Sequence, residues 1–186
     1  MVSIQQNLTQ YAAYHRDRRN IATHFVGVPM IVFAIILALA TVWIPLGPVT
    51  ATLAVVFSAL TVAYYLALDV KLAITMAIVY FLMCAAASEI THRLGLGASL
   101  GLAGAIFVVG WIIQFVGHKF EGMKPAFFDD AKQLLIGPVF VCAEVYFLLG
   151  LRDDLRGYIE ARVGPTVARR DGRPIPLGTY PDYPTQ

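Results

Sequence analysis

The chain has 186 residues, of which 58% are hydrophobic and 14% are charged, with a formal net charge of +2 at pH 7. Soluble domains carry roughly 25% charged residues, so this composition, with a mean hydropathy of +0.68, predicts an integral membrane protein. The small, scattered net charge argues against nucleic-acid binding. Both cysteines, Cys84 and Cys142, lie in apolar segments and indicate neither a disulfide framework nor a thiolate metal site.

Residues 3–14 form the first predicted element, a short amphipathic helix that we expect to lie on the membrane surface. His15 and the charged break 16–19 follow, and Asn20 is placed to cap the first spanning helix. That helix carries His24 near its start, and Pro29 removes one backbone donor within it. We therefore expect a kink just beyond His24.

The apolar segments predict the membrane crossings. Residues 25–68 contain no charged residue or histidine, which is enough for two crossings because about 20 apolar residues span the hydrocarbon core. A tight turn at 44–48 separates the first crossing from a second at 49–68; the third ends near 88, and the fourth covers 99–117 after a loop at 94–98. A fifth apolar segment, 134–151, is broken by Gly137 and Pro138 and need not cross fully.

The predicted fold class is all-α, a polytopic integral membrane helical bundle of four to five spanning helices plus the N-terminal surface helix. We expect one membrane-embedded bundle at 1–151. Residues 152–186 then form an amphipathic and later Pro-rich tail, cytoplasmic or disordered. Lys and Arg in short loops concentrate on the side of the N-terminus, which predicts a cytoplasmic N-terminus.

A polar face ends the fourth predicted crossing. Trp111, Gln114, His118 and Glu121 follow one another at spacings of 3, 4 and 3, and so share one helix face within roughly 80°. Such groups are costly to bury at the end of an apolar helix unless something binds them. The face is either a polar helix end wetted by headgroups and water, or one wall of a metal site.

The positions of the histidines add weight to the metal site but leave both interpretations open. By the count of crossings, His15, His24 and His118 come out on the cytoplasmic side, whereas His92 comes out on the opposite side beside Glu89. Three neutral imidazoles suit iron, zinc or copper. A further ionisable residue, Glu144, lies inside the fifth apolar segment, where such residues are usually functional.

Two stretches resemble one known family. Tyr14, His15, Asn20, His24 and Pro29 reproduce a Y-H-x4-N-x3-H-x4-P pattern. Residues 110–126, GWIIQFVGHKFEGMKPA, reproduce a G-W-x2-Q-F-x-G-H-x2-E-x3-P-A pattern. Both are similar to the family of the yeast endoplasmic-reticulum 2-hydroxy-fatty-acid dioxygenase, which acts in phytosphingosine breakdown. The likeness covers residues 11 to about 150 and leaves out the Pro-rich tail.

The resemblance implies an Fe(II)-dependent α-oxidation, in which a long-chain 2-hydroxy fatty acid and O2 give CO2 and a fatty acid one carbon shorter. It implies that His15, His24 and His118 bind the iron, with His92 a weaker match. A member in a bacterium would lie in the cytoplasmic membrane and one in a eukaryote in the endoplasmic reticulum, with the active site facing the cytoplasm.

Other residues would act beside the metal. The resemblance implies that Asn20, Gln114 and Glu121 are catalytic, orienting the ligands or the substrate. The substrate carboxylate is expected near the basic residues at this membrane surface, Lys119 and Lys124 among them, with Glu144 as a further substrate contact. Because the reaction supplies all four electrons that reduce O2, no flavin, nicotinamide or 2-oxoglutarate is needed.

Three alternatives differ in ways that can be tested. A membrane scaffold or lipid-binding protein with interfacial histidines would purify without stoichiometric iron. A di-iron hydroxylase or desaturase needs more clustered histidines than the four of this chain. A transporter would show paired broken helices or repeated halves, and the sequence shows neither.

Overall fold

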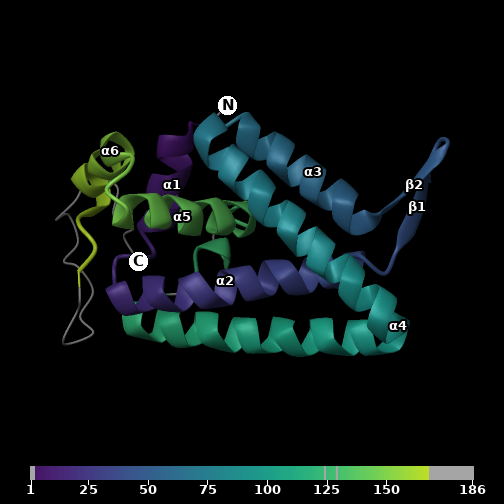
Figure 1. The fold of residues 1–186 in the computed structure, drawn as a ribbon. Coiled ribbons are helices and arrows are strands. Elements are labelled where there is room, and N and C mark those ends of the chain that lie inside the picture. The colour runs from purple at the N-terminus through teal and green to yellow at the C-terminus, as the bar shows by residue number, and fades with distance from the viewer. Residues whose placement is uncertain (1–2, 124, 129, 168–186) are drawn as a thin grey trace. The chain divides into compact units, whose positions relative to one another are not determined.

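The computed structural model describes residues 3–123, 125–128 and 130–167. Figure 1 shows the helices and strands in chain order, and their internal contacts divide the chain into two compact units. The first unit comprises Met1–Val28 and Ile112–Gln186, and the second comprises Pro29–Trp111. Two helices, α2 (Arg18–Leu39) and α4 (Val70–Glu121), run from one unit into the other.

The first unit is built around α1 (Ile4–Ala12), α5 (Gln133–Leu148) and α6 (Asp153–Val163). A reciprocal capping box between Ser3 and Gln6 starts α1, which confirms the predicted helix. Its buried face, which includes Leu8 and Tyr11, is covered by α5 and α6. The apolar face that suggested a surface helix is therefore used for packing against protein.

The second unit begins with a β-hairpin of β1 (Trp43–Leu46) and β2 (Val49–Thr52), in which Trp43 pairs with Thr52. Of the predicted turn at 44–48, residues 44–46 belong to β1, and only residues 47–48 form the tip of the hairpin. Thr52 then caps α3 (Leu53–Leu66), which lies along the first half of α4, with the Tyr65 and Tyr80 rings 6.5 Å apart. Because residues 49–52 are extended, α3 has only 14 residues and is shorter than the predicted second crossing.

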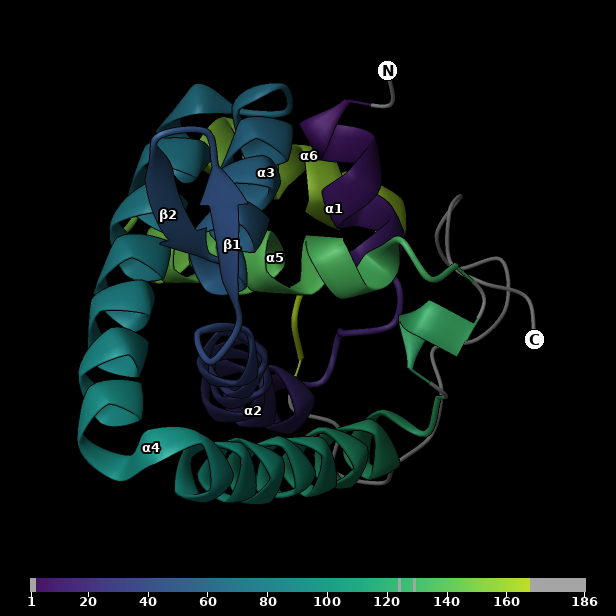
Figure 2. The same cartoon turned by 90° about the vertical axis from the view of Figure 1, so that its right-hand side faces the viewer.

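Helix α4 contains the third and fourth predicted crossings. Inside its 52 residues only Gly95 departs from helical geometry, with φ 72° and ψ 179°, a conformation that a residue with a Cβ rarely adopts. The helix changes direction there (Figure 2). The predicted loop at 94–98 is thus reduced to one glycine.

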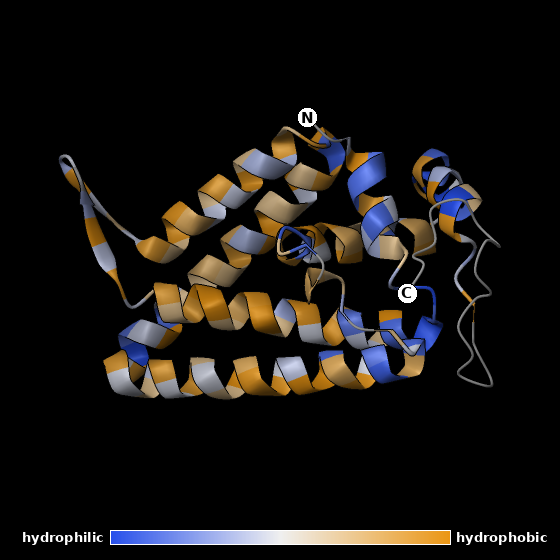
Figure 3. Ribbon diagram, turned by 180° about the vertical axis from the view of Figure 1, so that it is seen from behind, coloured by the Kyte–Doolittle hydropathy of each residue, from blue (hydrophilic) through white to orange (hydrophobic). Residues whose placement is uncertain are grey.

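Two described helices, α2 and α4, are long and apolar enough to cross a membrane, and apolar residues cover most of their length (Figure 3). Helices α5 and α6 would add a third span if counted together, although they are bent by 111°. The predicted four to five spans are not confirmed, and the hairpin shows that the fold is not entirely α. Hydropathy alone cannot distinguish an apolar strand or a short packed helix from a crossing.

Smaller expectations also changed. Helix α2 begins at Arg18, so Asn20 lies in its first turn and is not its cap. Pro29 lies inside the helix, as predicted, and the kink beyond His24 stays a prediction. A short 3₁₀ turn, η1 (Ala126–Phe128), lies between α4 and α5. The start of the predicted tail is ordered as α6, which buries Leu155 and Ile159; its Pro-rich part lies outside the described residues. The boundary at 151/152 stays a prediction.

Candidate metal centre

His15 is fixed by the end of α1. It follows the last turn of that helix, and its ring lies parallel to the Tyr11 ring with 4.1 Å between their centroids. Its Nδ1 is 2.7 Å from the Tyr11 carbonyl oxygen, and the residue is only 1% exposed. Tyr11 is in turn accommodated by Gly137 of α5, where an added Cβ would lie 3.0 Å from the Tyr11 hydroxyl.

His24 is held in the same manner from α2. Its Nδ1 is 2.8 Å from the carbonyl oxygen of Asn20, one turn earlier, and the side chain is buried. A carbonyl oxygen can only accept a hydrogen bond, so Nδ1 carries the proton in both His15 and His24. Each Nε2 of the neutral rings then carries a lone pair and no proton. The two Nε2 atoms lie 3.0 Å apart.

His118 comes from near the end of α4 and completes the cluster. Its ring centroid is 4.9 Å from that of His15 and 5.2 Å from that of His24. The preceding Gly117 makes this approach possible, because a Cβ there would lie 2.0 Å from Thr23 Oγ1 and 2.6 Å from Asn20 Oδ1. Only a glycine lets α4 come this close to α2.

The three imidazoles could bind one cation. One ring nitrogen from each lies within 4.8 Å of the others, and ligands about 2.1 Å from a common ion are spaced by about 3–4 Å. Facing lone pairs on His15 and His24 repel unless a cation or a proton lies between them. A proton is disfavoured because burial, and then the charge of the neighbouring His24 and His118, hold the pKa of His15 well below 6.5. A divalent metal ion fits this donor set best.

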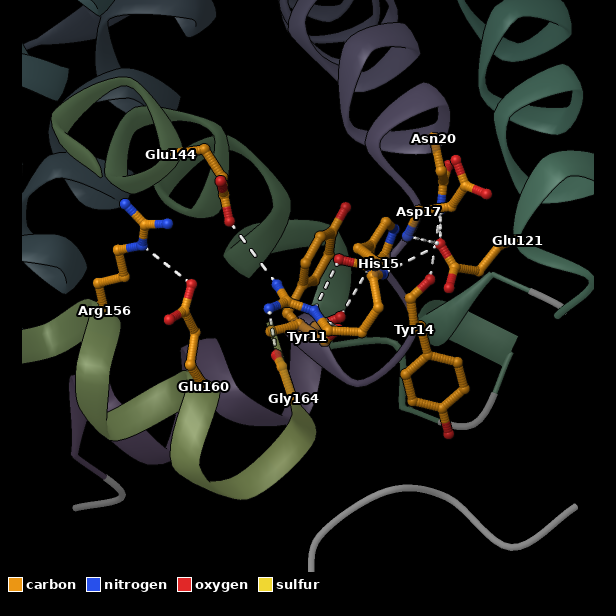
Figure 4. A network of polar contacts seen from close by, with 12 residues as sticks. Tyr11, Tyr14, His15, Asp17, Asn20, Glu121, Glu144, Arg156, Glu160 and Gly164 are labelled. Carbon is orange, nitrogen blue, oxygen red and sulfur yellow. Dashed lines mark hydrogen bonds and ion pairs between the residues drawn. The ribbon is translucent and has the colours of Figure 1, made fainter. Parts of the chain in front are cut away.

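Glu121 joins the segment between the ligands to the end of α4. Its Oε2 accepts hydrogen bonds from the backbone nitrogens of Arg16 at 3.0 Å and Asp17 at 2.8 Å, and from Asn20 Nδ2 at 3.1 Å (Figure 4). The carboxylate is completely buried at the N-terminus of α2, where negative charge is stabilised. Its geometry is that of a positioning residue.

Two further residues were not singled out from the sequence. Asp17 caps α2, since its Oδ1 accepts from the Arg19 backbone nitrogen at 2.8 Å; an Asp directly before a helix is a recognisable signal. Arg16 is 1% exposed, and its guanidinium donates to the carbonyl oxygens of Ala12, His15 and Gly164 (Figure 4). No local signal separates Arg16 from the exposed Arg18 and Arg19.

The remaining predicted site residues are distributed as follows. Gln114 is buried one turn before His118, and its Nε2 has no hydrogen-bond partner among the described residues. Lys119 is exposed, and Lys124 lies outside the described residues. His92 is exposed, belongs to the second unit and is not in the cluster that the described residues form.

Glu144 lies beside a cavity of the first unit. One carboxylate oxygen is 3.7 Å from the Arg16 guanidinium. The cavity, of about 410 Å³, lies between α2, α5 and α6. Besides charged residues it has an apolar lining of Ile21, Ala22, Phe25, Phe147, Leu148 and Ile159. Such an amphipathic cavity, which is lined in part by Arg16, the residue after His15, is suited to a ligand with an apolar chain.

Comparisons with known proteins agree with this geometry. A family profile described as 2-hydroxy-palmitic acid dioxygenase Mpo1-like matches residues 1–149. The chain is 29% identical over 163 residues to the 2-hydroxy-palmitic acid dioxygenase MPO1 of Saccharomyces cerevisiae, covering 86% of this chain and 89% of that protein. No solved structure matches. The chain therefore belongs to the Mpo1-like family.

Proposed function

We propose that the protein is an Fe(II)-dependent dioxygenase that converts a long-chain 2-hydroxy fatty acid and O2 into a fatty acid one carbon shorter, CO2 and water. The main support is the cluster itself, in which two deprotonated Nε2 atoms face each other at 3.0 Å with a third imidazole beside them. The family match supports the substrate class.

The reaction balances without an added reductant. Cleavage of the bond between C1 and C2 oxidises C2 from an alcohol to a carboxylic acid and C1 to CO2, which releases four electrons. Four electrons are the number that O2 needs for its full reduction, and the acid, CO2 and water together account for both of its oxygen atoms. When bound, Fe(II) supplies the redox chemistry and open positions at which O2 and the substrate meet.

The protein residues hold and orient the groups that react. His15, His24 and His118 would bind the iron as neutral imidazoles, and the Tyr11 and Asn20 carbonyls fix the tautomers of the first two. Burial keeps bulk water from the site. The buried Nε2 of Gln114, which has no partner within the described part of the chain, can donate a hydrogen bond to the substrate.

The cavity beside Glu144 is where we place the acyl chain. Each buried CH2 contributes about 0.8 kcal/mol, or about fourfold in affinity, so longer chains bind more tightly. Ala22→Phe would narrow this cavity and should raise KM for a C16 substrate more than for a C8 substrate. Lys119 and Lys124, next to the cluster in sequence, would attract the carboxylate before it reaches the iron.

The direct test uses purified protein, Fe(II), O2 and 2-hydroxy C16 acid, with C15 acid and CO2 measured as products in stoichiometric amounts. Iron and zinc are compared in parallel, since imidazoles accept both. If the protein binds stoichiometric iron but forms no C15 product, it is a metal-binding protein and the proposed dioxygenase activity is wrong. Protein that takes up no metal would instead support a membrane scaffold or lipid-binding protein.

A further inference from the structure

We propose that residues 164–167, which lie beyond the matched family region, position His15 in the metal centre by pairing with the chain around Arg16. This inference rests on the proposed metal-binding function. It assigns a role to a segment that follows α6 and that contains none of the candidate ligands.

The first link is the buried Arg16 side chain. Its Nε donates to the carbonyl oxygens of Ala12 and His15, both at 2.9 Å, and its Nη1 donates to that of Gly164 at 3.0 Å. One planar guanidinium therefore joins the chain on both sides of the His15 ring to the chain that leaves α6. Lysine cannot reproduce several directed donors in a fixed plane.

The second link is made by the backbone. The Val167 nitrogen donates to the Arg16 carbonyl oxygen at 2.9 Å, and the Arg18 nitrogen donates to the Val167 carbonyl oxygen at 3.0 Å. These two bonds form a short parallel bridge opposite Asp17. With Glu121 accepting from the Arg16 and Asp17 nitrogens, the segment between α1 and α2 is held by two separate parts of the chain.

The arrangement matters because the two facing ligands are anchored to different helices. His15 is anchored to α1 through the Tyr11 carbonyl and ring, whereas His24 is anchored within α2. Their 3.0 Å separation therefore depends on the non-helical residues that connect α1 to α2. A link that fixes those residues fixes the distance between the two ligand atoms.

Glu144 supports the same link electrostatically. Its carboxylate lies 3.7 Å from Arg16 Nη2, and a buried cation without a nearby anion would be strongly destabilising. The Arg16 guanidinium is thus surrounded by three carbonyl oxygens and one carboxylate. Every contact fixes the loop, and none requires Arg16 to touch the metal.

Val167→Pro tests the link with the smallest chemical change. Proline removes the N–H that bonds to the Arg16 carbonyl, at a residue that is 38% exposed. Val167→Ala keeps the N–H and is the matched control. Full-length variants are titrated with Fe(II) under anaerobic conditions and with Co(II), whose visible absorption reports the number of ligands.

We expect Val167→Pro to weaken metal binding by about tenfold, the lower end of the effect seen when partners of metal ligands are removed, and Val167→Ala to match the wild type. Excess Fe(II) should restore turnover in Val167→Pro, with KM for the fatty acid unchanged. Because excess metal also stabilises the folded state, the helix content of the metal-free variants is compared first, and a role in overall folding alone would lower it in Val167→Pro. Equal metal affinity and Co(II) spectra in the proline and alanine variants would overturn the proposal.

Arg16→Lys provides a second route to the same result. Lysine preserves the positive charge that faces Glu144 but not the directed bonds to the Gly164 and His15 carbonyls, so metal binding should again weaken while helix content is retained. If the wild type itself binds no metal, the proposed function fails together with this inference. If the wild type binds metal and neither variant weakens it, only the positioning role fails.

Discussion

The two units of the chain use polar side chains in opposite ways. In the described part of the first unit, buried residues include a guanidinium, three imidazoles and the carboxylates of Asp17, Glu121 and Glu144. In the described part of the second unit, the buried polar residues are limited to hydroxyl-bearing side chains such as Ser58 and Thr61, and large apolar residues such as Phe81 are exposed. The first unit therefore buries charged groups, whereas the second exposes apolar residues, as is typical of a surface that contacts lipid.

The difference follows from what each environment can solvate. Buried charges persist only where hydrogen bonds and opposite charges replace water, and the first unit provides these between α1, α2 and the end of α4. An apolar surface is stable where the solvent is hydrocarbon, which accounts for the exposed face of the second unit. Substitutions of the same type in the two units should therefore have very different effects.

The largest expected effect is that of His118→Ala compared with His92→Ala. The first removes one of three candidate ligands, so stoichiometric metal and turnover should both be lost, with activity at least about a thousandfold lower. The second changes an exposed residue of the other unit and should leave metal content unaltered. Metal analysis and the C15 assay measure both. Loss of metal in His92→Ala would instead make His92 a ligand.

A second comparison pairs two glycines of α4. Gly117→Ala would place a Cβ 2.0 Å from Thr23 Oγ1, so α4 must move away from α2 at a cost of about 1–3 kcal/mol, and His118 moves with it. Gly104→Ala meets nothing within 4 Å and should be neutral or stabilising by up to about 1 kcal/mol. Thermal unfolding and metal content are measured for each. Similar stability of the two variants would contradict the close approach of α4 to α2.

A third comparison pairs two glutamates. Glu121→Gln replaces a buried carboxylate that accepts three hydrogen bonds by a neutral amide, which should cost about 1–3 kcal/mol. Glu89→Gln disturbs only an exposed ion pair with Arg93 and should change stability by less than about 0.5 kcal/mol. Denaturant unfolding in detergent measures the difference. If Glu121→Gln is as stable as the wild type, these three hydrogen bonds contribute little to the free energy of unfolding.

The smallest expected effect is on pH dependence. Because the pKa of His15 is below 6.5 in the folded state, mainly through burial, the unfolded chain binds its proton first as the pH falls. The contribution of His15 to the stability of the metal-free protein is therefore fully present above about pH 6.5 and is lost as the pH falls below it. His15→Gln should flatten this dependence. If the free energy of unfolding of His15→Gln falls as steeply between pH 7 and pH 5 as that of the wild type, other groups cause the pH dependence.

Much of the site followed from short-range sequence patterns. Helical spacing placed Gln114, His118 and Glu121 on one face, and in the structure all three are buried. The prediction that His15, His24 and His118 meet came from counting crossings, and the cluster confirms it even though the number of spans was not confirmed. The membrane side that these histidines face stays a prediction.

What the sequence determined by itself is the apolar character of the chain, its helices and the residues able to bind a metal. Periodicity and capping depend on neighbours a few residues apart, and these are visible in the sequence. The tertiary structure alone decided that Glu121 secures the backbone around Arg16, and that Gly164 and Val167 complete the surroundings of His15. These partners are more than 100 residues apart in the chain, so only packing brings them within hydrogen-bonding distance.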